Sequence, residues 1–311
     1  MRRSFPAVLV ALGGLTGCGP GAPARPATTP GAQAATKPVA TARSEVGVTA
    51  AVARVEVGQA AAPPRPAEVP RAAGAEPPAS VDESTPARPA CPGEMTLLPG
   101  GVCIDRWEGS LVQVDERGRE RPWSPFLTVK QSRQPLRAVS VPNVVPQGYI
   151  SGIQAERACK LAGKRLCTAP EWEKACRGPG GTLYPYGNAR RAHTCNDDGR
   201  PVHPVSEATI RMKLPESRLW YENMEHPVIN QLPNTLRRTG ELGECTNDFG
   251  VFDMVGNLHE WIADADGTFR GGFYMDTRVN GEGCMYATTA HGKGYHDYST
   301  GFRCCKDATT E

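Results

Sequence analysis

The sequence contains no Phe, Tyr or Trp between Pro6 and Arg106, and residues 19–90 consist mainly of Ala, Pro, Val, Thr and Gly. Without large apolar side chains, this segment buries too little surface to offset the conformational entropy lost on folding. We therefore expect residues 18–90 to form a disordered tether. The chain also has no repeat of fixed period, which argues against a solenoid.

Two functional classes lack support in the sequence. The chain carries 35 Lys and Arg against 33 Asp and Glu, so no basic field indicates a nucleic-acid partner. It has no Gly-x-Ser-x-Gly motif, which argues against a serine hydrolase of the nucleophile-elbow type. We therefore expect neither a nucleic-acid partner nor this type of hydrolase activity.

The N-terminus predicts export and lipidation. Arg2 and Arg3 precede an apolar run over residues 7–15, which is too short to span a bilayer and is typical of a signal peptide. The following residues, LTGC, end at Cys18 and read as a lipobox. We expect residues 1–17 to be a signal peptide and Cys18 to anchor the chain to a lipid bilayer, in the cell envelope and facing the periplasm or exterior. The alternative is an ordinary signal peptide in which Cys18 is incidental.

Residues 91–311 are long enough for a single domain with one core, and all five tryptophans lie in this range. Of eleven cysteines, ten remain after Cys18, and an even number in an oxidising compartment favours disulfides over a thiol or metal site. Their connectivity does not follow from the sequence alone.

Two helices are predicted from their boundaries. Ser151 is a candidate N-cap for a helix that ends at Gly163, with Ile153, Ala158, Leu161 and Ala162 on the buried side. Thr168 and Glu171 have the spacing of a capping box for a second helix, which ends at Gly178 and places Trp172, Ala175 and Cys176 on one face. Dense Gly, Pro and Asn elsewhere predict irregular loops and short strands.

Four motifs together resemble the formylglycine-generating enzyme, or sulfatase-modifying factor, family. They are GKRLCTAPEWEKACRG at residues 163–178 with YPYG at 184–187, NDFGVFDMVGNLHEW at 247–261, RGG at 270–272 and TGFRC at 300–304. The resemblance implies an α+β fold in a single compact, irregular domain, a variant of the C-type lectin-like fold, stapled by disulfides.

The resemblance also implies two particular disulfides, Cys159 with Cys304 and Cys176 with Cys284. The pairing of the other cysteines stays open, with two candidate pairs. The six are Cys91 and Cys103 (first candidate pair), Cys167 and Cys305 (second candidate pair), Cys195 and Cys245.

A structural calcium is the cofactor that the resemblance implies. Its ligands would be the side chains of Asp253 and Glu260 and the backbone oxygens of Gly256 and Leu258, which are the hard oxygen donors that Ca²⁺ prefers. A second calcium would use Asn196, with Asp197 as a further candidate ligand. The alternative is that Asp253 and Asn257 cap turns.

The copper site of the family is altered. The resemblance implies a C-x-x-x-x-C pair that binds Cu(I) through two thiolates, and this sequence has Asp276 and Gly281 at those positions. Phe273 replaces the serine of the G-G-S motif, and His259 replaces the first Trp of W-E-W. A carboxylate and a glycine cannot substitute for two thiolates, so we expect no copper-dependent formylglycine formation.

Iron is also not expected as a cofactor. His291, His296 and Asp297 supply the residue types of a two-histidine, one-carboxylate iron site, but their spacing equally suits a hydrogen-bonded loop.

Two functions remain. The first is a non-catalytic envelope lipoprotein whose domain binds or assembles with an unknown envelope protein or glycan. The alternative is a divergent formylglycine-generating oxidase, or a related residue-modifying enzyme of sulfatase or siderophore maturation.

Overall fold

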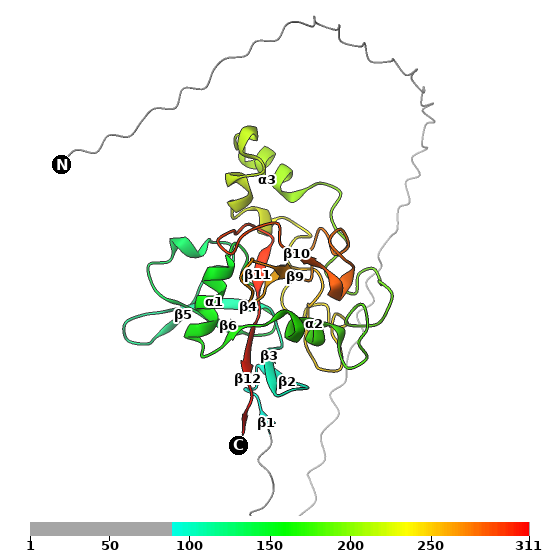
Figure 1. The fold of residues 1–311 in the computed structure, drawn as a ribbon. Helices are drawn as coiled ribbons and strands as arrows, with labels where there is room; N and C mark the ends of the chain where they lie inside the picture. Colours follow the sequence, from blue (N-terminus) through cyan, green and yellow to red (C-terminus); the bar gives the residue numbers. More distant parts are fainter. Residues whose placement is uncertain (1–88, 311) are drawn as a thin grey trace, which may run out of the picture. The chain divides into compact units, whose positions relative to one another are not determined.

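The computed structural model describes residues 89–310, which form an α+β domain of short elements joined by long irregular segments (Figure 1). The predicted fold class is confirmed. The predicted signal peptide, the predicted lipidation site Cys18 and almost all of the predicted tether lie outside the described residues. The described fold begins at Pro89, two residues before the predicted boundary, because Pro89 and Ala90 pair with Thr310 and Thr309.

The regular elements are short. The helices are α1 (Gly152–Leu161), α2 (Ala169–Arg177) and α3 (Pro204–Met212), with 3₁₀ turns η1 (Val129–Gln131), η2 (Glu216–Arg218), η3 (Glu222–Glu225), η4 (Ile229–Gln231) and η5 (Gly283–Met285). The strands are β1 (Pro89–Ala90), β2 (Met95–Leu98), β3 (Val102–Asp105), β4 (Gly109–Val114), β5 (Glu120–Pro122), β6 (Leu136–Ser140), β7 (Arg165–Leu166), β8 (His259–Trp261), β9 (Phe269–Arg270), β10 (Ala287–Thr288), β11 (Thr300–Phe302), β12 (Cys304–Asp307) and β13 (Thr309–Thr310). None of these helices is long and apolar enough to cross a bilayer.

Four small sheets bring distant segments together. Their strand orders are β10-β9-β8-β11, β2-β3-β12-β7, β5-β4-β6 and β1-β13. The contact between β8 and β11 is parallel, with Glu260 opposite Gly301, whereas β12 lies antiparallel to both β3 and β7. Residue 303 therefore lies between two strands that belong to different sheets, and it links them.

Both predicted helices are present with their predicted caps. The amide of Gln154 donates to Ser151 Oγ (3.3 Å), and the amide of Thr168 donates to Glu171 Oε2 (2.8 Å). Gly163 and Gly178 follow the helix ends at φ 68° and 63°, a region that favours glycine.

The predicted buried face of α1 is partly wrong. Ile153 is 59% and Leu161 46% exposed, whereas the buried residues are Gly152, Ala155, Ala158 and Cys159. Small residues are required on this face because a Cβ on Gly152 would lie 3.2 Å from the Trp261 ring. Trp172, Ala175 and Cys176, which were predicted to share one face of α2, are the buried residues of this helix.

Five disulfides staple the domain. The structure contains both pairs that the resemblance implied, Cys159–Cys304 and Cys176–Cys284, and both candidate pairs, Cys91–Cys103 and Cys167–Cys305. The fifth pair, which the sequence left open, is Cys195–Cys245. Adjacent cysteines at 304 and 305 therefore fix β12 to α1 on one side and to the segment that precedes α2 on the other.

Candidate functional site

The loop that carries the predicted calcium ligands has a left-handed backbone at three positions. Asp253, Gly256 and Asn257 have φ values of 59°, 80° and 56°. Gly256 has no room for a side chain, because a Cβ there would lie 2.3 Å from the Asn196 backbone oxygen. Asn257 donates its amide to that same oxygen (2.9 Å), and the Asn196 side chain donates to Asn257 Oδ1 (2.9 Å). The two segments predicted to bind calcium therefore meet.

A buried ion pair holds the end of this loop. Arg303 Nη2 lies 2.8 Å from Glu260 Oε1, and both side chains are at most 1% exposed. Trp172 in α2 donates its indole N–H to Glu260 Oε2 (2.7 Å). Arg303 also donates to the backbone oxygens of Asp105 and Phe252. One guanidinium thus connects three segments, and its five donors are largely satisfied.

Glu108 is a third buried acid at this site, and no sequence motif indicates it. Its carboxylate accepts from the Asn257 side chain (2.6 Å) and from the Leu258 backbone amide (3.2 Å). These partners lie 149 and 150 residues away in the sequence, so no local spacing indicates them. Glu108 is fully enclosed and holds the same loop through these two hydrogen bonds.

The three acids outnumber the one base that they surround. Burial, and then the negative charges of Asp253 and Glu260, raise the pKa of Glu108 well above its ordinary value. Burial raises the pKa of Asp253 to about 7. Burial opposes the charge on Arg303, but Glu260 more than compensates and raises the pKa of that guanidinium. With all groups ionised the cluster carries two excess negative charges, so protons or a cation must neutralise it.

The side chains predicted to bind calcium are mostly engaged. Asp253 Oδ2 accepts from the Gly240 amide (2.7 Å), and both Glu260 oxygens accept from Arg303. Within residues 89–310, no three His, Cys, Asp or Glu side chains form a group suited to a metal ion. In the same range the backbone oxygens of Asp253 and Gly256 accept no hydrogen bond. Calcium here stays a prediction, and it would depend on those carbonyls and the excess negative charge.

The second predicted calcium site is occupied by protein groups. Asp197 Oδ2 lies 2.8 Å from Arg190 Nε and accepts from the Thr277 hydroxyl (3.1 Å). The Asn196 amide donates to the Thr235 carbonyl (2.8 Å) as well as to Asn257. Asn196 and Asp197 therefore act as loop supports, and a calcium ion at this position would compete with these contacts.

The positions of the altered copper pair have structural roles of their own. Asp276 Oδ1 accepts from the amides of Arg278 (2.9 Å) and Val279 (3.1 Å), so it caps a turn. Gly281 has φ 106°, and a Cβ there would lie 2.6 Å from the Met285 carbonyl oxygen. A cysteine at this position would require the backbone to shift.

His259 and Phe273, the two other altered positions, form one aromatic cluster. The His259 ring lies 4.8 Å from Phe273 and 4.5 Å from Phe269, and Tyr286 completes the surroundings at 5.5 Å. Burial lowers the pKa of His259 to about 3. The imidazole is therefore neutral at physiological pH, and its Nδ1 has no partner within the described part of the chain.

Of the three residues considered for iron, Asp297 is engaged in a hydrogen-bonded loop. Tyr295 donates its hydroxyl to Asp297 Oδ2 (2.6 Å), and Ser299 donates its amide (2.8 Å) and hydroxyl (2.7 Å) to Asp297 Oδ1. His291 stacks on Tyr295 with a centroid distance of 3.7 Å. His296 Nδ1 lies 3.5 Å from Glu225.

An irregular α+β domain with this motif loop, the Arg303–Glu260 pair and these disulfides defines the class of formylglycine-generating-enzyme-like domains. A family profile described as "sulfatase-modifying factor enzyme 1-like domain" matches residues 95–309, and the chain belongs to this family.

Curated relatives include both active and inactive proteins. The chain is 31% identical over 124 residues to the formylglycine-generating enzyme of Bos taurus, covering 38% of this chain and 27% of that protein. It is 29% identical over 176 residues to the inactive C-alpha-formylglycine-generating enzyme 2 of Bos taurus, covering 52% of this chain and 50% of that protein. The chain thus spans half or less of the length of these relatives.

Among solved structures, the U1 variant of the Major Tropism Determinant matches with a TM-score of 0.38 and 14% identity. The match covers 73% of this chain and 55% of that one.

Proposed function

We propose that this chain is a membrane-anchored, extracytoplasmic lipoprotein whose formylglycine-generating-enzyme-like domain is a non-catalytic binding or assembly module. One observation carries the proposal: Asp276 and Gly281 stand at the copper-cysteine positions, and all ten cysteines of residues 89–310 are in disulfides. Copper(I) requires soft thiolate ligands, and the described domain has no thiol to supply them. The similarity to a protein named as inactive is compatible with this proposal.

Asp276 and Gly281 also have structural roles, so replacing them with cysteines would disturb the local structure. Asp276 holds its turn through two backbone amides, and Gly281 has space only for hydrogen. Cys284, the nearest cysteine in sequence, is joined to Cys176. These contacts favour a scaffold that is stable without the copper pair. They argue against an oxidase that has only exchanged its copper ligands.

The test of this proposal measures copper binding and oxygen consumption by the full chain. We expect no stoichiometric copper(I) binding and no oxygen consumption with a Cys-x-Pro-x-Arg peptide, with an active formylglycine-generating enzyme as the positive control. The variant Asp276→Ala should behave like the unmodified chain in both assays. Conversion of the peptide cysteine to formylglycine would establish the alternative, a divergent oxidase or related residue-modifying enzyme.

Membrane attachment is tested at Cys18, which lies outside the described residues. We expect Cys18→Ala to move the protein from the membrane fraction to the soluble fraction, because acyl chains on this residue would provide the stable anchor. Immunoblots of fractionated cells, washed at high salt, measure the distribution. A variant that stays with the membrane after the wash would exclude lipidation of Cys18 as the anchor.

Calcium is proposed as a structural ion at the loop of Asp253, Gly256, Leu258 and Glu260, where it would offset the excess charge of the acidic cluster. When bound, calcium would supply positive charge to hard oxygen donors. Ligand binding to the native state at a hundredfold excess over Kd stabilises it by about 2.7 kcal/mol. A rise in melting temperature after chelation and add-back is the expected result.

The pH dependence of stability distinguishes calcium from protons. Without calcium, folded Asp253 keeps its proton up to about pH 7, whereas the unfolded chain releases it near the ordinary value of 3.8. The free energy of unfolding should therefore fall as the pH rises from 3.8 to about 7, and it should stay constant at higher pH. Calcium, or the variant Asp253→Asn, should reduce this loss of stability. Urea denaturation at a series of pH values measures it. A wild-type stability that neither falls with pH nor responds to calcium would contradict the proposal.

A further inference from the structure

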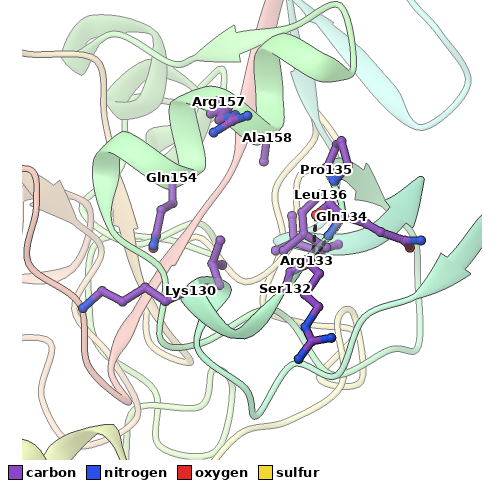
Figure 2. Close-up of a pocket in the computed structure, with 11 residues that line it drawn as sticks. Lys130, Ser132, Arg133, Gln134, Pro135, Leu136, Gln154, Arg157 and Ala158 are labelled. Atoms are coloured by element: carbon purple, nitrogen blue, oxygen red, sulfur yellow. Dashed lines mark hydrogen bonds between the residues drawn. The ribbon is translucent and has the colours of Figure 1, made fainter. Parts of the chain in front are cut away.

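A hollow of about 480 Å³ lies between α1 and the segment of residues 129–136 (Figure 2). Figure 2 shows Gln154, Arg157 and Ala158 on α1, facing the segment that carries Lys130 and Arg133. We call this feature the basic hollow. Its lining residues are Leu111, Val129, Lys130, Ser132, Arg133, Gln134, Pro135, Leu136, Gln154, Arg157 and Ala158. None of the residues of the altered copper pair belongs to it.

The basic hollow concentrates positive charge that the protein does not neutralise. Within residues 89–310, Lys130, Arg133 and Arg157 form no ion pair and their side chains donate no hydrogen bond, and no Asp or Glu lines the hollow. Nearby arginines differ: Arg137 in β6 pairs with Glu120 at 2.6 Å, and Arg165 in β7 pairs with Glu171 at 2.7 Å. Three unpaired cations around one concave surface create a positive potential that attracts anions.

The rest of the lining is amphipathic. Leu136 and Ala158 are at most 7% exposed and form an apolar floor together with Leu111. Gln154 is held in place because its Oε1 accepts from the Ser151 amide (3.0 Å), and this leaves its Nε2 as a further donor. A ligand with both a carbon part and an anionic head fits such a surface.

We propose that the basic hollow binds a phosphate-bearing ligand. Two guanidinium groups offer the forked donor geometry that matches phosphate oxygens, and an ammonium group adds a point charge. A phosphomonoester carries about 1.5 to 2 negative charges near neutral pH, so it balances three cations better than a single carboxylate does. A soluble phosphomonoester and the headgroup of phosphatidic acid, which is itself a phosphomonoester, share this chemistry.

The inference rests on the proposed function for its biological role, since it supplies a ligand to a binding module. Its experiment measures binding alone and does not depend on oxidase activity. Failure of one proposal is therefore distinguishable from failure of the other.

The experiment uses the full chain with Cys18→Ser, so that lipidation does not contribute to membrane association. Glycerol phosphate is titrated calorimetrically, and vesicles of phosphatidylcholine with or without phosphatidic acid are tested by co-sedimentation. The hollow variant is Arg133→Gln with Arg157→Gln. The control is Arg121→Gln with Arg278→Gln, which removes the same charge from two exposed arginines that do not line the hollow.

We expect saturable binding that the hollow variant weakens by at least about tenfold, or about 1.4 kcal/mol, and that the control leaves intact. Binding of glycerol phosphate identifies a soluble ligand, and binding only to phosphatidic acid vesicles identifies a lipid headgroup. If both variants lost affinity equally, the effect would come from net charge alone, and the inference would be overturned. The absence of saturable binding in both arms would overturn it as well.

Discussion

Glu260→Gln is expected to lower the free energy of unfolding by about 3–5 kcal/mol, because it removes the carboxylate that forms the ion pair with the buried Arg303 guanidinium. Arg303 is 0% and Glu260 1% exposed, so water cannot solvate the guanidinium in place of the lost carboxylate. Glutamine keeps the shape and an acceptor for the Trp172 indole, which isolates the effect of charge. Urea denaturation under non-reducing conditions, with chelator present, measures the change.

The control for this prediction is Glu156→Gln. Glu156 pairs with Lys160 at 2.7 Å on the surface of α1, where the two side chains are 38% and 67% exposed. Exposed pairs of this type contribute about 0.5 kcal/mol. If Glu260→Gln changed stability no more than Glu156→Gln does, the Arg303–Glu260 pair would not be a structural support of the motif loop.

Removing the Cys159–Cys304 disulfide with alanine at both positions is expected to destabilise the domain by about 2–5 kcal/mol. The bridge joins α1 to β12 across a sequence separation of 145, so the unfolded chain gains much freedom when it is lost. Chain-entropy arguments give a larger effect for long loops than for short ones. Chemical denaturation of the purified variant gives the change in unfolding free energy.

The matched comparison is the alanine pair at Cys91 and Cys103. This bridge spans a separation of only 12 residues, so its loss should destabilise the domain by about 1–2 kcal/mol less. The same ranking should hold for protease resistance. A larger effect at Cys91 and Cys103 than at Cys159 and Cys304 would show that native packing, and not loop length, determines the stabilisation.

Much of the fold was predictable because its information is local. The capping residues Ser151 and Thr168 and the glycines that follow both helices fix the helix ends through contacts within a few residues. The buried face of α1 was not predictable in the same way. Ile153 and Leu161 have apolar side chains, but the close approach of Trp261 admits only small residues on the packed face, and the apolar ones remain exposed.

The candidate site was predictable only in part. Motif positions identified the loss of the copper pair, since that inference needs residue types and no geometry. The engagement of Glu260 by Arg303 and the burial of Glu108 were not predictable, because each depends on residues at least 43 positions apart. The same holds for the basic hollow, whose two walls are adjacent only in the folded chain (Figure 2).

The sequence by itself determined the family, the fold class, two helix boundaries and two of the disulfides, because motifs and caps act over short distances or at fixed positions. Only the tertiary structure decided how charge is balanced. Within residues 89–310, it enclosed three carboxylates around one guanidinium and left three cations unpaired around one hollow. The physical reason is that burial, which sets the cost of a charge, depends on which distant segments pack together.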